Sequence, residues 1–205
     1  MKTIDKHEMY VSNAYRYKNF VQLTEEEKRM VLEWRNHESV RKWMYNTEII
    51  PLENHLKFID SLNNRTDCYY WMVYKNDEPD GVISIVDVDY ENGRVEPGCY
   101  RNPVTSKPGE GLDFFWNFYD FLFRGLEVEE CVGGIAVDNV MSILLNSYLG
   151  VQHKGKKTLL VQNQFKEFYV TYCNRGSWGG GGTAKNDIES LLAYYQSEDF
   201  KNWFK

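Results

Sequence analysis

The N-terminal part of the chain repeats apolar positions with the spacing of helices. Thr24 and Glu27 form a capping-box pattern just before an apolar run that opens at Met30, which predicts a helix of about 13 residues. A second, short helix is expected over residues 37–45. A third is expected to begin at Pro51, because the apolar residues after it recur every three or four positions. These residues are Leu52, Leu56, Ile59 and Leu62.

From residue 69 the pattern changes to that of β-strands. Apolar runs at residues 69–74 and 82–88 flank a polar turn at residues 76–81, which predicts an antiparallel hairpin. Another turn precedes a predicted strand over residues 94–101. Helices and strands then alternate: helix 109–125, strand 131–137, helix 139–149, and strands 158–161 and 165–173. This order predicts an α+β fold, in which a mixed, mostly antiparallel sheet carries helices on both faces.

The chain divides by composition into one domain and a tail. A length of 205 residues suits a single domain with a sizeable core. We expect that domain over residues 1–175, a Gly-rich linker over residues 176–185 and a C-terminal helix over residues 186–205. The aromatic-rich tail helix is expected either to dock on its own domain or to serve a homodimer, so both a monomer and a homodimer remain open.

Charge and cysteine usage exclude several classes of function. The net charge of −6 argues against a nucleic-acid-binding surface. No run approaches the roughly 20 apolar residues of a membrane span, and the N-terminus has no signal-peptide core, so a cytoplasmic protein without membrane association is expected. The four cysteines are far apart and form no Cys-x-x-Cys pair. Neither a metal site nor a disulfide framework is therefore expected.

A Gly-x-Gly turn lies between the strand at residues 94–101 and an apolar helical run. A strand, a glycine turn and a helix start together form an anion cradle, because unpaired N–H groups point out of the first helical turn. Glycines also let the backbone approach a diphosphate closely. The expected donors are the backbone N–H groups of Gly109, Glu110, Gly111 and Leu112, with Lys107 as a nearby cation. The alternative is a plain loop-to-helix cap.

Three segments within residues 14–173 resemble the GNAT acetyltransferase superfamily. Residues 106–111 match the glycines of the family's phosphate loop, although Ser106 replaces its leading Gln or Arg. Residues 139–151 resemble its Asn-x-x-Ala/Ser stretch that ends in Leu-Gly-Phe. The block from residue 34 to residue 55 looks most like the branch that acetylates 4-amino sugars on nucleotide carriers in the pseudaminic acid pathway. It is similar, more loosely, to the branch that acetylates N-terminal amines of ribosomal proteins.

The resemblance implies acetyl-CoA as co-substrate and a splayed pair of strands to admit it. Pro97 and Gly98 give a local reason for the splay, since proline removes a ladder donor and glycine favours a bulge. Backbone groups of Cys99, Tyr100 and Arg101 would then pair with the pantetheine amides like an added strand. One freed N–H there would polarise the thioester carbonyl. The alternative is that Pro97 only marks an edge strand.

The resemblance also implies direct attack of an amine, which needs a base. Glu96 is the first candidate because it resembles the acid that many members carry on this strand. Its alternative role is a solvated strand carboxylate. His37, His55 and Asp87 are held in reserve.

The late helix departs from the family at the position that usually carries a tyrosine, which here is Asn146. Helix geometry places Asn139, Ser142 and Asn146 on one face, with Tyr148 opposite as a core residue in a stripe with Met141. Asn139 and Asn146 are therefore predicted cofactor contacts. Asn146 can donate a hydrogen bond to sulfur but cannot deliver a proton, so water or Tyr100 is expected to act there.

The acceptor site is expected in the N-terminal block, at Arg35, Asn36, Trp43 and His55. A sugar ring suits aromatic and hydroxyl-binding neighbours, and Arg35 suits a phosphate or carboxylate. The alternative is ordinary helix packing for the tryptophans. The sequence thus predicts an acetyl-CoA-dependent N-acetyltransferase acting on a small-molecule amine, with a nucleotide-linked amino sugar favoured. The alternatives are a peptide N-terminal amine as acceptor and a degenerate CoA-binding or interaction domain.

Overall fold

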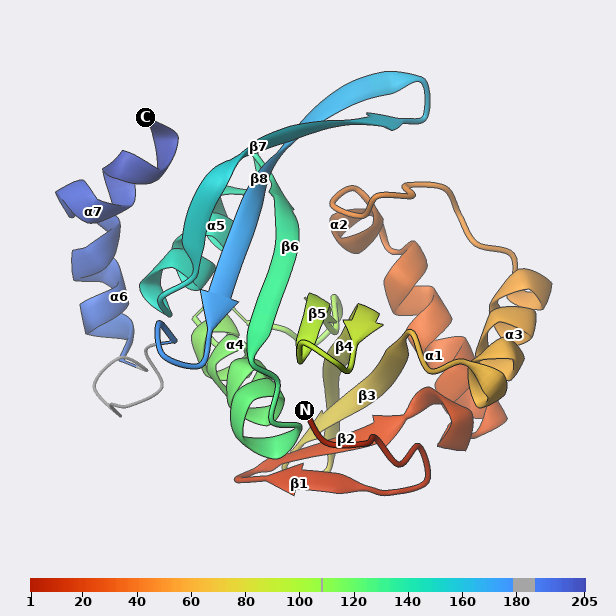
Figure 1. The fold of residues 1–205 in the computed structure, drawn as a ribbon. Helices are drawn as coiled ribbons and strands as arrows, with labels where there is room; N and C mark the ends of the chain where they lie inside the picture. Colours follow the sequence, from red (N-terminus) through yellow and green to blue (C-terminus); the bar gives the residue numbers. More distant parts are fainter. Residues whose placement is uncertain (108, 179–186) are drawn as a thin grey trace.

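A twisted sheet of eight strands forms the centre of the protein (Figure 1). The computed structural model describes residues 1–107, 109–178 and 187–205. The strand order in the sheet is β1-β2-β3-β4-β5-β6-β8-β7, and every neighbouring pair is antiparallel except β5 and β6. The strands are β1 (Tyr10–Ser12), β2 (Tyr15–Asn19), β3 (Tyr69–Lys75), β4 (Glu78–Asp89), β5 (Arg94–Arg101), β6 (Glu130–Ala136), β7 (Gln152–Val161) and β8 (Gln164–Asn174).

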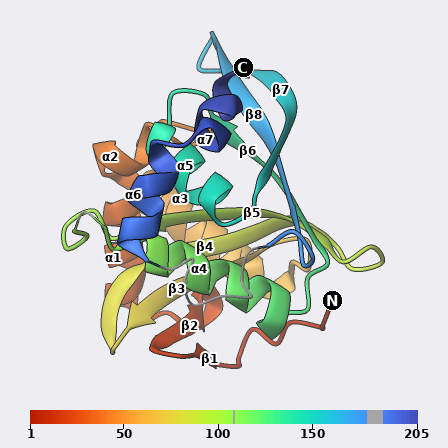
Figure 2. The same ribbon diagram turned by 90° about the vertical axis from the view of Figure 1, so that its left-hand side faces the viewer.

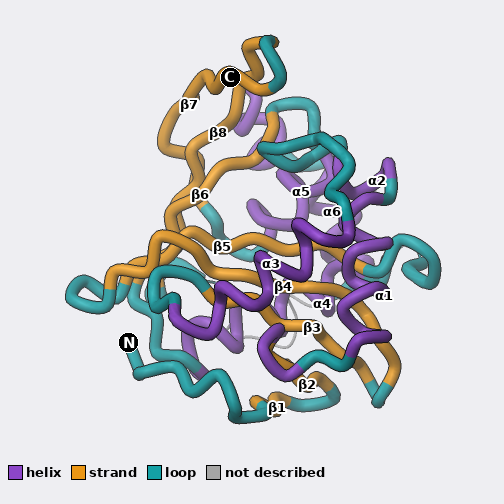
Figure 3. The backbone as a smooth tube through the Cα atoms, turned by 90° about the vertical axis from the view of Figure 1, so that its right-hand side faces the viewer, coloured by secondary structure: helices purple, strands orange, loops and turns teal. Residues whose placement is uncertain are grey.

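Helices cover both faces of the sheet, which confirms the predicted fold class. Figure 3 shows the first of these faces and Figure 2 the second. The first face carries α1 (Glu25–Asn36), α2 (Glu38–Arg41) and α3 (Leu52–Ser61). The second carries α4 (Gly111–Asp120), α5 (Val140–Tyr148), α6 (Ile188–Tyr195) and α7 (Glu198–Lys201). Short 3-10 turns lie at Phe20–Gln22, Leu62–Asn64 and Asn202–Phe204, and a π-helical turn at Phe121–Gly125 extends α4.

Two apolar layers follow from the alternation of side chains along the strands. On β3, Trp71 and Val73 point into the layer under α4 and α5, whereas Met72 points into the layer under α1 and α3. Because both faces of β3 are covered, its apolar run is almost continuous, and the strand predicted over residues 69–74 is confirmed.

Local signals in the sequence mark several element ends correctly. The Thr24–Glu27 capping box forms as predicted, with Glu27 N–H donating to the Thr24 hydroxyl and Thr24 N–H donating to Glu27. Gly150 ends α5 with a φ of 93°, in the left-handed region that favours glycine.

Other boundaries differ from the prediction. The β3–β4 turn is shorter than residues 76–81: Asn76 and Asp77 both have positive φ, as in a two-residue hairpin turn, and the strand resumes at Glu78. The second helix ends at Arg41 rather than Tyr45. The fourth begins at Gly111 rather than Gly109.

Strands at both ends of the sheet were missed or shortened. In β2, Tyr15 and Tyr17 are buried between the charged residues Arg16 and Lys18, a two-residue period inside a polar stretch. β7 begins at Gln152, six residues before the predicted start at residue 158. The prediction missed these residues because they alternate between exposed and half-buried positions and carry little apolar signal.

The tail docks on the domain that precedes it. Trp203 is buried and stacks on His153 of β7 with ring centroids 5.5 Å apart, and Tyr194 of α6 contacts Tyr148 of α5 at the same separation. Trp178 is buried against Trp116, so part of the predicted linker belongs to the core. Residues 179–185 of that linker lie outside the described residues. Within the described part of the chain, no helix is long and apolar enough to cross a membrane.

Candidate active site

β5 and β6 separate soon after they pair. In the described structure they share only two register pairs, Arg94 with Glu130 and Val95 with Cys131. Pro97 and Gly98 follow at once on β5, where proline offers no N–H to a ladder. The predicted splay between two neighbouring strands is therefore confirmed, and it begins at Glu96.

A cavity of about 510 Å³ occupies this gap and reaches both faces of the sheet. The end toward α1 and α3 is named the acceptor end here after the acceptor site that the sequence predicts, and its lining includes Arg35, Trp43 and His55. The opposite end, toward α4 and α5, is named the donor end after the predicted cofactor site, and it is lined by Tyr119, Asn146 and their neighbours. Two substrates could therefore meet in the middle of the sheet from opposite faces.

The Gly-x-Gly turn lies at the start of α4, where the sequence predicts an anion cradle, but the Glu110 N–H, one of the four expected donors, already donates to the Lys107 carbonyl at 3.4 Å. Gly109 has a φ of 90°, a conformation that other residues adopt at a cost. Glu110, the N-cap residue, makes no side-chain hydrogen bond to the first turn. A Cβ on Gly111 would lie 3.3 Å from Leu145 Cδ1, so this glycine also permits close packing of α4 on α5.

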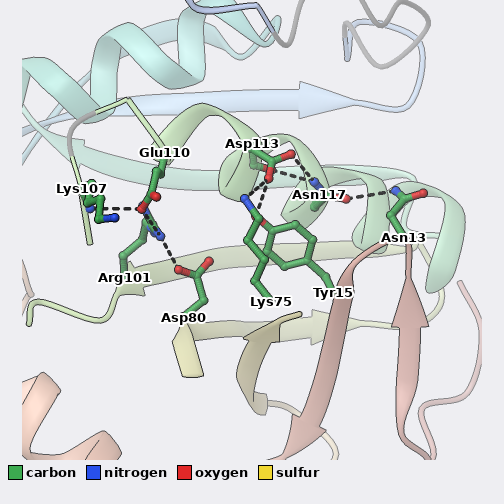
Figure 4. Close-up of polar contacts among 9 residues, drawn as sticks. All are labelled: Asn13, Tyr15, Lys75, Asp80, Arg101, Lys107, Glu110, Asp113 and Asn117. Atoms are coloured by element: carbon green, nitrogen blue, oxygen red, sulfur yellow. Dashed lines mark hydrogen bonds and ion pairs between the residues drawn. The ribbon is translucent and has the colours of Figure 1, made fainter. Parts of the chain in front are cut away.

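The acidic residues beside the cradle are bound to cations (Figure 4). The Glu110 carboxylate accepts hydrogen bonds from the Lys107 backbone N–H at 3.1 Å and from the Arg101 guanidinium at 3.2 and 3.3 Å. These contacts, led by the Lys107 N–H, lower the pKa of Glu110. Asp113 contacts Lys75 Nζ at 2.6 Å and the Tyr15 hydroxyl at 2.8 Å, toward β2 and β3. Neither carboxylate therefore needs to face an incoming phosphate.

The Arg101 side chain has a structural partner on β4. It forms an ion pair with Asp80 in addition to its contact with Glu110. Its guanidinium thus ties β4, β5 and the start of α4 together through its two terminal nitrogens. Lys107 is exposed beside the cradle.

On α5 the predicted face is correct for the polar residues. Asn139, Ser142 and Asn146 all line the cavity, and Asn139 caps the helix by accepting a 3.3 Å hydrogen bond from Ser142 N–H. Tyr148 lies away from the cavity, against α6, as expected of a packing residue. Met141, predicted to pack in the core, is 63% exposed instead.

Tyr119 is a cavity residue that the sequence did not reveal. Its hydroxyl donates a 2.8 Å hydrogen bond to Asn146 Oδ1, and Asn146 Nδ2 donates to Ser142 O at 2.8 Å. Both ends of the Asn146 amide are therefore engaged within the protein. In sequence Tyr119 belongs to an aromatic run that indicated only helix packing, and its contact with Asn146 joins two helices.

Glu96 lines the cavity where the strands part, and its partner Tyr45 was also missed. The Tyr45 hydroxyl donates a 2.9 Å hydrogen bond to Glu96 Oε1. Burial and the charge of Glu96 raise the pKa of Tyr45. Tyr45 lies in the segment between α2 and α3, which is fastened by a hydrogen bond from Thr47 to Gln162 in the β7–β8 turn. No periodic pattern marks such a segment.

The three reserve candidates for the base either lie outside the cavity or contact another part of the protein. His37 is exposed at the start of α2 and Asp87 is exposed in β4, and neither lines the cavity. His55 lines the cavity, but its Nε2 lies 3.0 Å from the carbonyl of Lys28. Burial lowers the pKa of His55, which favours the neutral ring.

The two residues after Gly98 face opposite sides of the sheet. The Cys99 thiol lies on the α4 side, and burial raises its pKa to about 12, so it stays protonated. Tyr100 lies on the α1 side, with its hydroxyl 3.5 Å from the carbonyl of Val31. Because Tyr100 does not share a face with Asn146, we do not retain it as the proton donor to sulfur.

The acceptor end brings three of the four predicted residues together. Arg35, Trp43 and His55 line the cavity. Arg35 Nη2 donates a 2.6 Å hydrogen bond to Asn46 O, whereas its Nη1 is buried and has no hydrogen-bond partner among the described residues. Burial lowers the pKa of the Arg35 guanidinium. An unpaired buried donor on a cation is a favourable contact for an anionic group of a ligand.

Asn36 has a different role from the one predicted. Its Oδ1 accepts from Ile50 N–H at 2.8 Å and its Nδ2 donates to Ile50 O at 2.9 Å. Asn36 does not line the cavity. Its amide instead fastens the segment before α3 to the end of α1.

Residues 19–152 match the family model described as acetyltransferase (GNAT) domain. The chain belongs to this family. The predicted assignment as an acetyl-CoA-dependent N-acetyltransferase of the GNAT class is thereby confirmed. The match covers the sheet from β3 to β6, the cradle and the segment that carries Tyr45.

Relatives and solved structures agree with this assignment. Over 158 residues the chain is 28% identical to "Acetyltransferase PseH" of Campylobacter jejuni serotype O:2, covering 74% of this chain and 88% of that protein. The crystal structure of C. jejuni N-acetyltransferase PseH in complex with acetyl coenzyme A has a TM-score of 0.60 and 20% identity, covering 78% of this chain and 99% of that one. Spermidine N-acetyltransferase from Vibrio cholerae in complex with CoA and spermine has a TM-score of 0.71 and 11% identity, covering 80% and 97%.

Proposed function

We propose that the protein transfers the acetyl group of acetyl-CoA to the amine of a nucleotide-linked amino sugar by direct attack in a ternary complex. The observation that carries the proposal is the charge pattern of the cavity. Arg35 presents an unpartnered buried Nη1 at the acceptor end, and Glu96 presents a carboxylate in the gap. This pair suits an acceptor with a phosphate at one end and an amine at the other.

The donor end fits acetyl-CoA. The first-turn N–H groups of α4 and the positive φ of Gly109 suit a diphosphate, and the nearby acids are bound to Arg101 and Lys75. The unpaired edge of β5 after Val95 suits the amides of the pantetheine arm. When bound, acetyl-CoA supplies the thioester that the amine attacks.

Three groups of this chain would then promote attack. Glu96 accepts the proton of the acceptor amine, directly or through water, so that the nitrogen attacks in its neutral form. Tyr45 holds the Glu96 carboxylate in place. A backbone N–H near Cys99 in the splay donates to the thioester carbonyl as negative charge develops on its oxygen.

The same charge pattern argues against two other acceptors. A polyamine carries several positive charges, whereas the described lining offers one carboxylate and places a guanidinium at the far end. A peptide N-terminus would meet a half-buried tryptophan and Arg35 rather than an open groove. The similarity to PseH of C. jejuni and the resemblance of the block at residues 34–55 to the pseudaminic acid branch both support the sugar nucleotide.

Turnover measurements test the proposal. Release of CoA should be followed with UDP-linked 4-amino sugars, with spermidine and with a peptide that carries a free N-terminal alanine. We expect saturable turnover with the amino-sugar nucleotides alone. If kcat/KM for the peptide were similar to that for the amino-sugar nucleotide, the proposed acceptor would be wrong. Binding of acetyl-CoA without turnover of any amine would indicate a CoA-binding domain.

A further inference from the structure

The Tyr119 hydroxyl lies on the donor side of the splay. Tyr119 is in the last turn of α4, is 4% exposed and lines the cavity. Cys99 of β5 and Ile135 of β6, the two strands that separate, line the same cavity. A thioester that reaches the gap from the α4 and α5 side therefore passes close to this hydroxyl.

Asn146 fixes the direction in which this hydroxyl donates. The Ser142 carbonyl can only accept, so the Nδ2 group of Asn146 must face it at 2.8 Å. The same Nδ2 also lies 3.3 Å from Ser142 Oγ. Oδ1 is then turned toward Tyr119 and accepts a hydrogen bond from its hydroxyl, with 2.8 Å between the two oxygens. The phenol is thus held with its O–H directed along the donor face of α5.

We infer that Tyr119 donates the hydrogen bond that stabilises the sulfur leaving group, and that Asn146 positions it. The inference rests on the proposed acetyl transfer. As the amine nitrogen bonds to the acetyl carbon, the C–S bond breaks and its electron pair stays on sulfur. The Tyr119 O–H turns from Asn146 to that sulfur by rotation about its C–O bond. The proton of the amine passes to Glu96 or water, and the thiolate takes a proton from solvent as it leaves.

Burial of the phenol supports a hydrogen-bond role rather than full proton transfer. Burial raises the pKa of Tyr119 well above its ordinary value, so the phenol keeps its proton while it faces the thiolate. Rotation of one O–H that is already in place requires less reorganisation than ordering solvent around the developing charge. Tyr148, the other tyrosine of this region, lies against α6 and cannot serve.

Binding of two cofactor forms tests the inference without any acceptor. The affinities of CoA and of desulfo-CoA are measured by calorimetry from pH 7 to pH 10, a range that spans the ordinary thiol pKa of about 8.5. In the wild type we expect the preference for CoA to grow as pH rises, because the thiolate receives the Tyr119 hydrogen bond. Tyr119→Phe should reduce the rise in the ratio of CoA affinity to desulfo-CoA affinity about tenfold, and Tyr148→Phe should leave that rise unchanged.

Kinetics supply a second readout. Tyr119→Phe should lower kcat about 10- to 100-fold with an unchanged Kd for acetyl-CoA. Asn146→Leu should reduce the preference for CoA only in part, and it provides a test if Tyr119→Phe does not fold. The inference is wrong if the preference of the wild type for CoA over desulfo-CoA does not rise with pH although both bind. It is also wrong if folded Tyr119→Phe keeps that rise. Neither result affects the proposed function. A wild type that binds neither cofactor overturns the proposed function itself.

Discussion

The Tyr45 hydroxyl lies between the two strands that part, 2.9 Å from Glu96 Oε1 on β5 and beside Gly134 on β6. A Cβ added to Gly134 would lie 2.6 Å from that hydroxyl, closer than such atoms approach in proteins. Gly134 therefore leaves the space that Tyr45 needs to reach the carboxylate. A segment between two helices, one glycine and one acid act together at the centre of the cavity.

This relationship predicts a non-additive pair of substitutions. Tyr45→Phe should lower kcat about tenfold through loss of a hydrogen bond to a charged group, with little change in acetyl-CoA affinity. Gly134→Ala should lower kcat by a similar factor because it displaces the hydroxyl. In the Tyr45→Phe background Gly134→Ala should add little, since the clashing atom is gone. Gly133→Ala is the control for a methyl group near Glu96, because its Cβ would lie 3.8 Å from Glu96 Cγ in ordinary contact and would not meet the Tyr45 hydroxyl. Additive effects in steady-state kinetics would refute the relationship.

We expect Glu96→Gln to lower kcat/KM for the amine by a factor that depends on pH. The variant should be about 100-fold slower near neutral pH, where most acceptor amine arrives protonated and needs a base. The difference from wild type should narrow as pH rises, because a growing share of the amine arrives neutral. The measurement is kcat/KM for the amine from pH 6 to pH 9.5, with Glu129→Gln on the surface as control. An equal rate at every pH would remove Glu96 as the base.

We expect substitution of Arg35 to weaken binding of the acceptor but not of acetyl-CoA. Arg35→Met should raise KM for a nucleotide-linked acceptor about 10- to 100-fold, because an anionic group loses a charged donor. The Kd of acetyl-CoA should not change. Arg41→Met is a matched control, since Arg41 also donates to a carbonyl of the same segment, that of Thr47, without lining the cavity. An equal rise in KM for both variants would attribute the effect to the segment.

We expect substitution of Gly109 to weaken binding only of ligands that carry the diphosphate. Gly109→Ala should cost about 1 kcal/mol of stability through its positive φ and weaken CoA about tenfold. Binding of acetyl-pantetheine, which has no diphosphate, should be unaffected. Gly93→Ala has a positive φ of the same kind, in the β4–β5 turn, and should lower stability without weakening CoA. Equal losses for both ligands in calorimetry would count against the cradle.

His55 predicts a pH dependence of stability. Its pKa is lowered in the folded protein, so the unfolded chain binds the proton more readily. The stability contributed by neutral His55 is present above the unfolded pKa of about 6.5 and is lost as pH falls through the folded pKa. His55→Gln should therefore lose less stability than wild type between pH 7 and pH 5 in urea unfolding. A His55→Gln variant that loses as much stability as the wild type over this range would contradict the prediction.

Local chemistry explains which features the sequence predicted. The Thr24 capping box, Gly150, the Gly109 turn and the break at Pro97 each depend on a few adjacent residues, and so each can be recognised along the chain. The face of α5 with Asn139 and Asn146 follows from helix geometry alone. β2 and the edge strand β7 carry weak patterns, because charged residues separate the buried tyrosines of β2 and every second residue of β7 is exposed.

What the sequence could not predict depends on contacts between distant segments. Tyr45 reaches Glu96 across 51 positions, and Tyr119 meets Asn146 across 27. Asn36 has the composition of a ligand-binding residue, yet its amide pairs with the backbone of Ile50. An amide or hydroxyl has the same sequence signal whether it faces a ligand or another part of the chain.

In the described structure, only two register pairs join the β1–β5 part of the sheet to the β6–β8 part. Among the described residues, Val95 and Cys131 are the buried members of that joint, 1% and 3% exposed. A change of side-chain volume at either position would alter the angle between the two halves. It would shift the pantetheine edge and the Glu96 carboxylate together without touching either substrate. Residues that never meet a ligand thus set the width of the passage in which the two substrates react.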